Sequence, residues 1–169
     1  MTDLEKKEYA TKIEADQYIY GSADVVGLMC LKVFCNGNNE QYQGLVKPAM
    51  KLGSAFQKVN FLRDLKADIE NLDRRYFPEI VGTKLNEQNK TIIISDIEKD
   101  FHEAYSGIQK LPGKSKLAVL LAYYYYRILL KKIKHTPACK ILETRIRISN
   151  VRKLLLLLKA MVVYKFKLV

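Results

Sequence analysis

Apolar residues recur three or four positions apart through most of this 169-residue chain. That spacing places side chains on one face of a helix, whereas strands alternate with a period of two. The sequence shows no hairpin dipeptides between alternating runs, and 49% of its residues are hydrophobic, which is enough for one sizeable core. We therefore predict an all-α fold, with a charged leader at 1–15 and a single helical domain at 16–169.

Start and stop signals divide the chain into helices. The NGNN segment at 36–39 is a strong turn signal, and Pro112-Gly113 ends a later run. Pro48 predicts a break or the first turn of a new helix, because proline has no amide hydrogen. Signals for the N-terminus of a helix occur at three places. They are a capping box at Ser95–Glu98, a candidate cap at Ser115, and the N-cap and first-turn pair Thr136-Pro137. The predicted helices span about 16–35, 40–72, 95–111, 115–129 and 137–159.

The segment 53–68, GSAFQKVNFLRDLKAD, carries polar side chains along one side of its predicted helix. At about 100° per residue, Gln57, Asn60, Asp64 and Asp68 face the same space over roughly three turns. Two carboxylates four positions apart repel each other in an apolar setting, and a divalent cation compensates both. An all-oxygen set of this kind suits Mg²⁺. The spacing alone leaves open an ordinary solvated face on which neighbouring cations balance the two acids.

The pattern QxxNxxRDxxxD, read from Gln57 to Asp68, resembles the second aspartate-rich motif of the squalene/phytoene synthase family. Two other segments are similar to that family, the tyrosine-rich YIYGSADVVGLM at 18–29 and RRYFP at 74–78. One position departs from the family pattern, since Asp24 stands where a glycine is expected. Taken without the resemblance, the first segment is equally typical of close helix packing, and the second of an apolar plug at a helix end.

The resemblance implies an isoprenoid synthase-type helical bundle, and a Mg²⁺-dependent condensation of two prenyl diphosphates head to head. Asp64 and Asp68 would be catalytic, and with Asn60 they would hold the metal. The implied substrate-binding residues, for a farnesyl or geranylgeranyl diphosphate, are Tyr18, Tyr20, Gln57, Asn60, Arg63, Tyr125 and Arg145. Within the run of four tyrosines at 123–126, the family pattern selects Tyr125, with Tyr126 as the neighbouring alternative.

The resemblance extends over the second part of the family's length only. The first aspartate-rich motif is not found, because Asp3, Glu5 and Glu8 have neither its spacing nor its apolar surroundings. In the family the first motif faces the second across the cavity. A metal site with carboxylates on one side only should ionise a diphosphate poorly. We therefore expect a truncated form, a separately translated portion or a degenerate relative, with little or no synthase activity alone. A second polypeptide that supplies the other wall is left open as a partner.

The net charge of +11 is unevenly placed. Residues 1–100 carry 14 Lys and Arg against 16 Asp and Glu, whereas residues 101–169 carry 15 against 2. A basic segment attracts phosphate-rich partners, which include diphosphates, anionic lipids and nucleic acids. The alternative to an enzyme is a non-enzymatic helical scaffold or membrane-surface protein of the same superfamily. Nucleic acid has only charge in its favour, and we expect no binding to it.

Three cysteines without a CxxC pair favour free thiols in a reducing compartment. No apolar core follows the charged residues near Met1, so we expect a cytoplasmic protein. The apolar run at 154–158 is too short to span a bilayer. Peripheral contact with a membrane surface stays open.

Overall fold

The computed structural model describes residues 6–166, and its helices confirm the predicted all-α fold. The elements in chain order are α1 (Lys12–Ile19), a π-helical turn η2 (Tyr20–Asp24), α2 (Val25–Phe34), α3 (Asn39–Leu72), a 3₁₀ turn η3 (Pro78–Ile80), α4 (Glu87–Lys110), α5 (Ser115–Lys134), α6 (Ala138–Ile141) and α7 (Asn150–Lys165).

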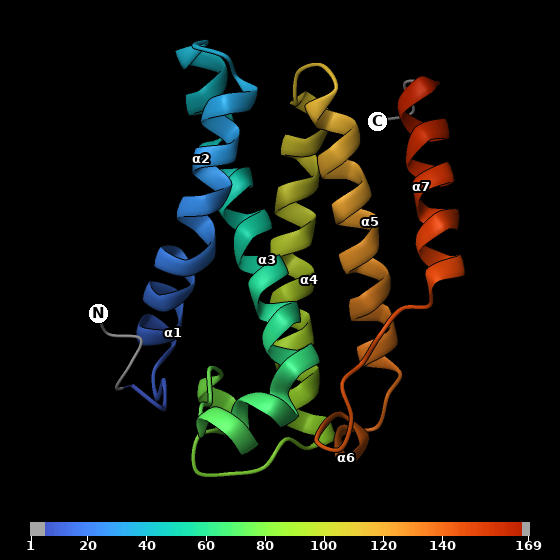
Figure 1. Ribbon diagram of the computed structural model, residues 1–169. Coiled ribbons are helices and arrows are strands. Elements are labelled where there is room, and N and C mark those ends of the chain that lie inside the picture. Colours follow the sequence, from blue (N-terminus) through green and yellow to red (C-terminus); the bar gives the residue numbers. More distant parts are fainter. Residues whose placement is uncertain (1–5, 167–169) are drawn as a thin grey trace.

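The long helices form one bundle with α3 at its centre. Successive long helices run in opposite directions, and α2, α3, α4, α5 and α7 lie with their axes roughly aligned (Figure 1). α3 packs on α1, α2, α4, α5 and α6, whereas α7 packs on α5. The main core lies between α3, α4 and α5 and includes the fully buried Leu62, Ile97, Phe101 and Leu129. α3 therefore positions the polar side chains along one side of segment 53–68, which we call its polar stripe.

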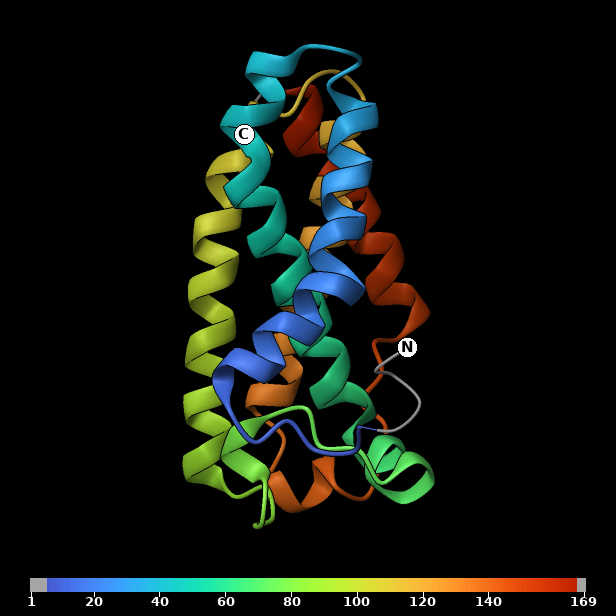
Figure 2. The same cartoon turned by 90° about the vertical axis from the view of Figure 1, so that its left-hand side faces the viewer.

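α1, η2 and α2 form one continuous helical segment that changes direction at the π-turn (Figure 2). Thr11 caps it through a capping box with Glu14, so the segment begins at Lys12 rather than at the predicted Asp16. A π-turn inserts one extra residue into the helix and often marks a functional site. Here the turn ends at Asp24, a buried residue that faces α3.

α3 is unbroken for 34 residues, and the break predicted at Pro48 is wrong. The ring of Pro48 faces Gly107 of α4, where an added Cβ would lie 2.3 Å from the proline Cβ. The missing side chain on α4 therefore gives the proline ring room inside the bundle. Tertiary packing here compensates the local cost of a proline in a helix.

One predicted helix start and one predicted helix cap are also wrong. α4 begins at Glu87, where Asn86 and Asn89 form a reciprocal capping box, so Ser95 lies inside the helix rather than at its cap. Ser115 is the first residue of α5, and its hydroxyl donates to the carbonyl of Pro112 instead of capping the helix. At α4 the side-chain cap forms at Asn86, upstream of the predicted helix start, whereas no side chain caps the backbone at the start of α5.

The last predicted helix, 137–159, is divided into two. α6 ends at Ile141, residues 145–149 are extended, and α7 begins at Asn150. Ile146 and Ile148 alternate as buried residues in the extended segment, so their side chains anchor it to the bundle. Arg145 and Arg147 therefore lie on an extended segment and not on a helix face.

The RRYFP segment after α3 packs against the main core as an apolar plug, and its Tyr76 and Phe77 are buried there. Tyr76 stacks on Phe61 with ring centroids 3.9 Å apart, and Tyr18 lies 5.3 Å from Tyr76. Tyr9, which precedes α1, is buried against Tyr18 at 4.9 Å. These four aromatic rings thus join α1 and the residues before it to α3 and the residues after it.

Candidate functional site

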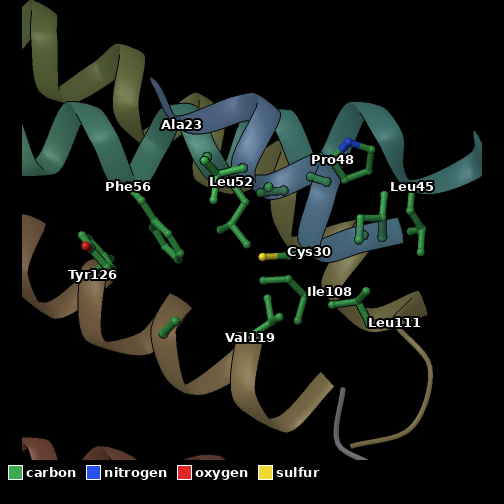
Figure 3. A pocket seen from close by; sticks show the side chains of 18 of the residues that line it. Ala23, Cys30, Leu45, Pro48, Leu52, Phe56, Ile108, Leu111, Val119 and Tyr126 are labelled. Atoms are coloured by element: carbon green, nitrogen blue, oxygen red, sulfur yellow. The ribbon is translucent and has the colours of Figure 1, made fainter. Parts of the chain in front are cut away.

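An apolar cavity of about 460 Å³ lies between α2, α3, α4 and α5 (Figure 3). Apolar side chains and glycines form most of its wall, among them Val26, Cys30, Leu31, Phe34, Leu45, Leu52, Phe56, Gly107, Ile108, Leu111, Val119 and Ala122. Cavities of this size and lining bind apolar ligands, whose orientation is fixed by a few polar groups at one end. A cavity along four helices suits an elongated hydrocarbon better than a compact polar ligand.

Two glycines let η2 and α2 approach α3 beside this cavity. An added Cβ on Gly53 would lie 3.0 Å from the carbonyl oxygen of Ala23, and one on Gly27 would lie 3.2 Å from that of Ala49. Both glycines also line the cavity, so the tight contact and the cavity share one wall. Larger residues would push the two helices apart.

Asp24 is buried beside Gly53 rather than in solvent. Its carboxylate accepts a hydrogen bond from Ser54 Oγ at 2.9 Å, and its side chain is 5% exposed. Burial raises the pKa of Asp24, and the hydrogen bond from Ser54 partly opposes that shift. The residue that departs from the family pattern therefore joins the π-turn to α3.

The polar residues of the cavity gather where α3 and α5 meet. Gln57 and Asn60 line it from α3, and Tyr126 lines it from α5. The hydroxyl of Tyr126 donates to Asn60 Oδ1 at 3.1 Å, while its ring stacks on Phe56 at 4.1 Å (Figure 3). The apolar cavity thus ends in two carboxamides and a phenol.

One helical turn further along α3, Asp64 is held by two guanidinium groups. Arg63 Nη2 lies 2.5 Å from Asp64 Oδ2, and Arg145 Nε lies 2.6 Å from Asp64 Oδ1. The hydrogen bond to Asp64 raises the pKa of Arg63. The side chain of Arg145 is 51% exposed, so it can change partners at little desolvation cost. This cluster is a clamp of a kind that can grip an anionic head group.

Asp68 is the less compensated of the two acids. Burial raises the pKa of Asp68 first, and the charge of Asp64 raises it further, while Arg74, Arg63 and Arg145 act in the opposite direction. A carboxylate in this state gains from an added cation. The described residues 6–166 contain no group of three or more His, Cys, Asp or Glu side chains placed to hold a metal.

The donor chemistry nevertheless fits a hydrated Mg²⁺. Asn60, Asp64 and Asp68 offer oxygen atoms from one face of α3, and Mg²⁺ commonly combines one or two carboxylates with water and substrate phosphate oxygens. A metal held in this way needs no cluster of three acids. The ion pairs of Asp64 with Arg63 and Arg145 would compete with a metal for that carboxylate.

The remaining predicted substrate residues lie in three different surroundings. Tyr18 is part of the aromatic stack around Tyr76, and Tyr20 is 48% exposed at the π-turn. Tyr125 is half-buried and, like Tyr126, raises the pKa of Arg63 slightly. Tyr126 is the tyrosine that lines the cavity; a run of four tyrosines around a helix does not reveal which one faces inward.

The family model for squalene/phytoene synthase matches residues 1–152, which include α1 to α6 and this whole site. The chain belongs to the squalene/phytoene synthase family. It is 28% identical over 148 residues to the chloroplastic phytoene synthase of an Oncidium hybrid cultivar, with 78% of this chain and 36% of the relative covered. Phytoene synthase 2 of Zea mays is 29% identical over 148 residues, with 78% and 37% covered.

A bacterial relative matches a shorter segment. Phytoene synthase of Thermus thermophilus is 36% identical over 78 residues, which cover 46% of this chain and 25% of the relative. The chain therefore spans between a quarter and somewhat over a third of the length of these relatives.

Proposed function

We propose that this chain binds a prenyl diphosphate, with the isoprenoid tail in the apolar cavity and the diphosphate at the Asp64 clamp, as part of prenyl transfer of the phytoene or squalene synthase type. One observation carries the proposal: the apolar cavity ends at Asn60, and the clamp lies one turn further along the same helix. Membership of the family supports the substrate class.

The dimensions suit such a ligand. The cavity borders α3 from Leu45 to Asn60, which at 1.5 Å per residue is about 22 Å. An extended chain of several isoprene units fits that length, and its burial is favourable in proportion to the apolar area removed from water. Inorganic diphosphate has no apolar tail, so the cavity would add nothing to its binding affinity.

Residues of this chain would handle the head group. Arg63 and Arg145 each present a planar fork that matches phosphate oxygens, and Arg145 would leave Asp64 for the diphosphate. The Tyr126 hydroxyl and the Gln57 carboxamide would orient the first atoms of the tail. The apolar wall would keep water from a cationic carbon that forms beside it.

Mg²⁺, held by Asn60, Asp64 and Asp68, would supply Lewis-acid neutralisation of the leaving diphosphate. With Arg145 turned to the substrate, Asp64 would keep Arg63 as its one guanidinium partner and would hold the cation together with Asp68. Metal and diphosphate binding should therefore be cooperative, each increasing the affinity for the other.

Calorimetric titration tests the proposal. Farnesyl or geranylgeranyl thiolodiphosphate, which resists cleavage, should bind more tightly in the presence of Mg²⁺, and more tightly than inorganic diphosphate. The double variant Asp64→Asn/Asp68→Asn should lose the Mg²⁺-dependent part of the binding. Equal affinity for prenyl and inorganic diphosphate, or unchanged binding by the double variant, would refute the proposal.

Low turnover by the chain alone stays a prediction. It is tested by incubating the chain with Mg²⁺ and either prenyl diphosphate and extracting the hydrocarbon products. Robust formation of a head-to-head product would overturn it, and would leave the binding proposal in place.

A further inference from the structure

Asp24 is a buried carboxylate at the end of the π-turn η2, and it is hydrogen-bonded but not ion-paired. Its two oxygens accept from Ser54 Oγ at 2.9 and 3.1 Å. In the described part of the chain no lysine or arginine lies within ion-pairing distance of it, since its cationic neighbours are bound to another acid. Burial of a charge without a paired cation is costly, whereas burial of the neutral acid costs far less. The fit of Asp24 between η2 and α3 therefore depends on its proton.

Two lysines of α3 lie near Asp24, and both bind an acid of α4. Lys51 Nζ is 2.7 Å from one oxygen of Asp100, and Lys58 Nζ is 2.7 Å from the other. Burial raises the pKa of Asp24 most, and the charge of Asp100 raises it further. Ser54, Lys58 and Lys51 act in the opposite direction without cancelling that rise.

The other elements packed on η2 leave this balance unchanged. The charged side chains of α1 and α2 have other partners, in the pairs Lys12–Asp96, Lys12–Asp16 and Glu14–Lys6, and with Lys32 over the ring of Tyr42. Among residues 6–166, the charged groups that act on Asp24 are thus Lys51 and Lys58 from α3 and Asp100 from α4.

Asp24 lies directly behind one wall of the apolar cavity. Residues on both sides of it in the chain line the cavity, together with two residues of α3 that face them, namely Ser22, Ala23, Val26, Gly27, Leu52 and Gly53. Figure 3 shows Ala23 beside Leu52 at this edge of the cavity. An added Cβ on Gly53 would lie 3.0 Å from both Asp24 Oδ1 and the carbonyl oxygen of Ala23. The turn and α3 are therefore in direct contact, and water can reach the carboxylate only if the turn moves.

We propose that Asp24 is a proton-controlled latch on this wall, whose neutral side chain holds η2 on α3 and whose ionisation loosens η2 and widens the cavity. The closed contact favours the protonated acid, so opening increases as pH rises. Lys51 is the cation that can follow the released carboxylate, because its side chain is 36% exposed, whereas Lys58 is buried between two acids.

The latch has a consequence for any apolar ligand of the cavity. A loosened wall admits water, so less apolar surface is removed from solvent and the ligand binds less tightly at higher pH. This consequence rests on the proposed function, whereas the latch itself does not.

Hydrogen exchange followed by mass spectrometry tests the latch in the full chain without ligand. Protection of the amides of residues 20–27, corrected for the intrinsic exchange rate at each pH, should fall between about pH 4 and pH 7. One proton limits the fall to about tenfold per pH unit. Asp24→Asn, which cannot ionise, should keep at every pH the protection that the unaltered chain has in acid. A flat profile in the unaltered chain, or the same fall in Asp24→Asn, would overturn the proposal.

Ser54→Ala separates a latch from a purely structural contact. The serine hydroxyl lowers the pKa of Asp24, so its removal should move the loss of protection to higher pH. Lower protection at every pH without such a shift would overturn the proposal. Circular dichroism should show each variant folded, and if Asp24→Asn does not fold, the direction of the Ser54→Ala shift decides. Asp16→Asn, an exposed position on α1, is the control and should leave the profile unchanged.

Farnesol tests the consequence for the cavity, because it has an isoprenoid tail and no group that titrates in this range. Its affinity, measured by calorimetry, should fall in step with amide protection in the unaltered chain and stay constant in Asp24→Asn. Affinity that ignores pH while the exchange changes would overturn the claim that the cavity widens. If the exchange follows the prediction and farnesol does not bind at any pH, the latch stands and the proposed placement of the tail fails.

Discussion

Arg145 grips Asp64 from 81 positions further along the chain, with Nε 2.6 Å from Oδ1 and Nη2 3.4 Å from Oδ2. The contact ties the extended segment after α6 to the polar stripe of α3. It also leaves a two-pronged cation, half in solvent, one helical turn beyond Asn60, where the apolar cavity ends. A diphosphate that reaches this point would find a donor already positioned for it.

Replacing Arg145 tests that role. Arg145→Ala should weaken the binding of a prenyl thiolodiphosphate by about tenfold or more, because hydrogen bonds to charged groups contribute about 1.5–3 kcal/mol each. Arg145→Lys should recover only part of the affinity, since lysine lacks the planar fork. Calorimetry with Mg²⁺ measures both variants.

Arg147→Ala is the control, since Arg147 is an exposed arginine on the same extended segment. It should bind as the unaltered chain does. If both alanine variants lose affinity equally, general basic charge and not the Asp64 clamp attracts the ligand.

Asp68 should make the free protein less stable as pH rises. Its pKa is raised in the folded chain, by burial first and by Asp64 second, so the folded state binds protons more tightly than the unfolded state. From the unfolded value of about 3.9 upward, ionisation therefore costs stability, and the cost is complete above the folded pKa. Asp68→Asn should unfold at a higher temperature at pH 7 without ligand, and the gain should vanish in acid.

Melting curves over a pH series, recorded by circular dichroism without Mg²⁺, check this sign. Asp16→Asn, on the exposed side of α1, should change little. A lower melting temperature for Asp68→Asn at pH 7 would show that the carboxylate stabilises the fold rather than serving a ligand.

The contact between Pro48 and Gly107 should tolerate no added methyl group. Gly107→Ala places a Cβ 2.3 Å from the Cβ of Pro48, and should lower the free energy of unfolding by about 1–3 kcal/mol through overpacking. Gly44→Ala, in the same helix as Pro48 but with no atom within 4 Å of the new Cβ, should raise it by up to about 1 kcal/mol. Urea denaturation measures both, and destabilisation of equal size would contradict the packing argument.

Lys58 anchors α3 to α4 through two acids. Its ammonium lies 2.5 Å from Asp96 and 2.7 Å from Asp100, and the lysine is 7% exposed. Burial alone lowers the pKa of Lys58, but the hydrogen bonds to Asp100 and Asp96 outweigh it and keep the group charged. Lys58→Met should lower the free energy of unfolding by about 3 kcal/mol, because it leaves the buried Asp100 less well paired.

Lys47→Met is the matched control, since Lys47 pairs with Glu103 at 3.4 Å in an exposed position. It should change stability by less than about 0.5 kcal/mol. Similar losses in the two methionine variants would mean that burial of the Lys58 pair adds nothing.

Local sequence patterns predicted the helical fold and the row of polar side chains on α3, but not the contacts that other segments make with it. The turn at 36–39 and the end near Leu72 bound α3 correctly, because turn residues act on their immediate neighbours. The polar stripe of α3 was predictable because helical periodicity alone places Asn60 and Asp64 on one face.

The failures share a cause in tertiary packing. Pro48 stays helical because Gly107, on another helix, leaves space for its ring. Arg145 reaches Asp64 because its segment is extended, and that depends on where Ile146 and Ile148 find the core. Tyr126 faces the cavity because its ring stacks on Phe56. In each case the deciding contact is distant in sequence.

Photolabelling would test the central claim most directly. A farnesyl diphosphate with a diazirine at the far end of its tail should, on irradiation with Mg²⁺, label α2, α3 and α4 around Phe34, Leu45 and Leu111, where the cavity ends opposite Asn60. Excess unlabelled prenyl diphosphate should remove the label, as should Asp64→Asn/Asp68→Asn. Label confined to α7 or spread over the surface, unaffected by the competitor, would contradict a tail bound in this cavity.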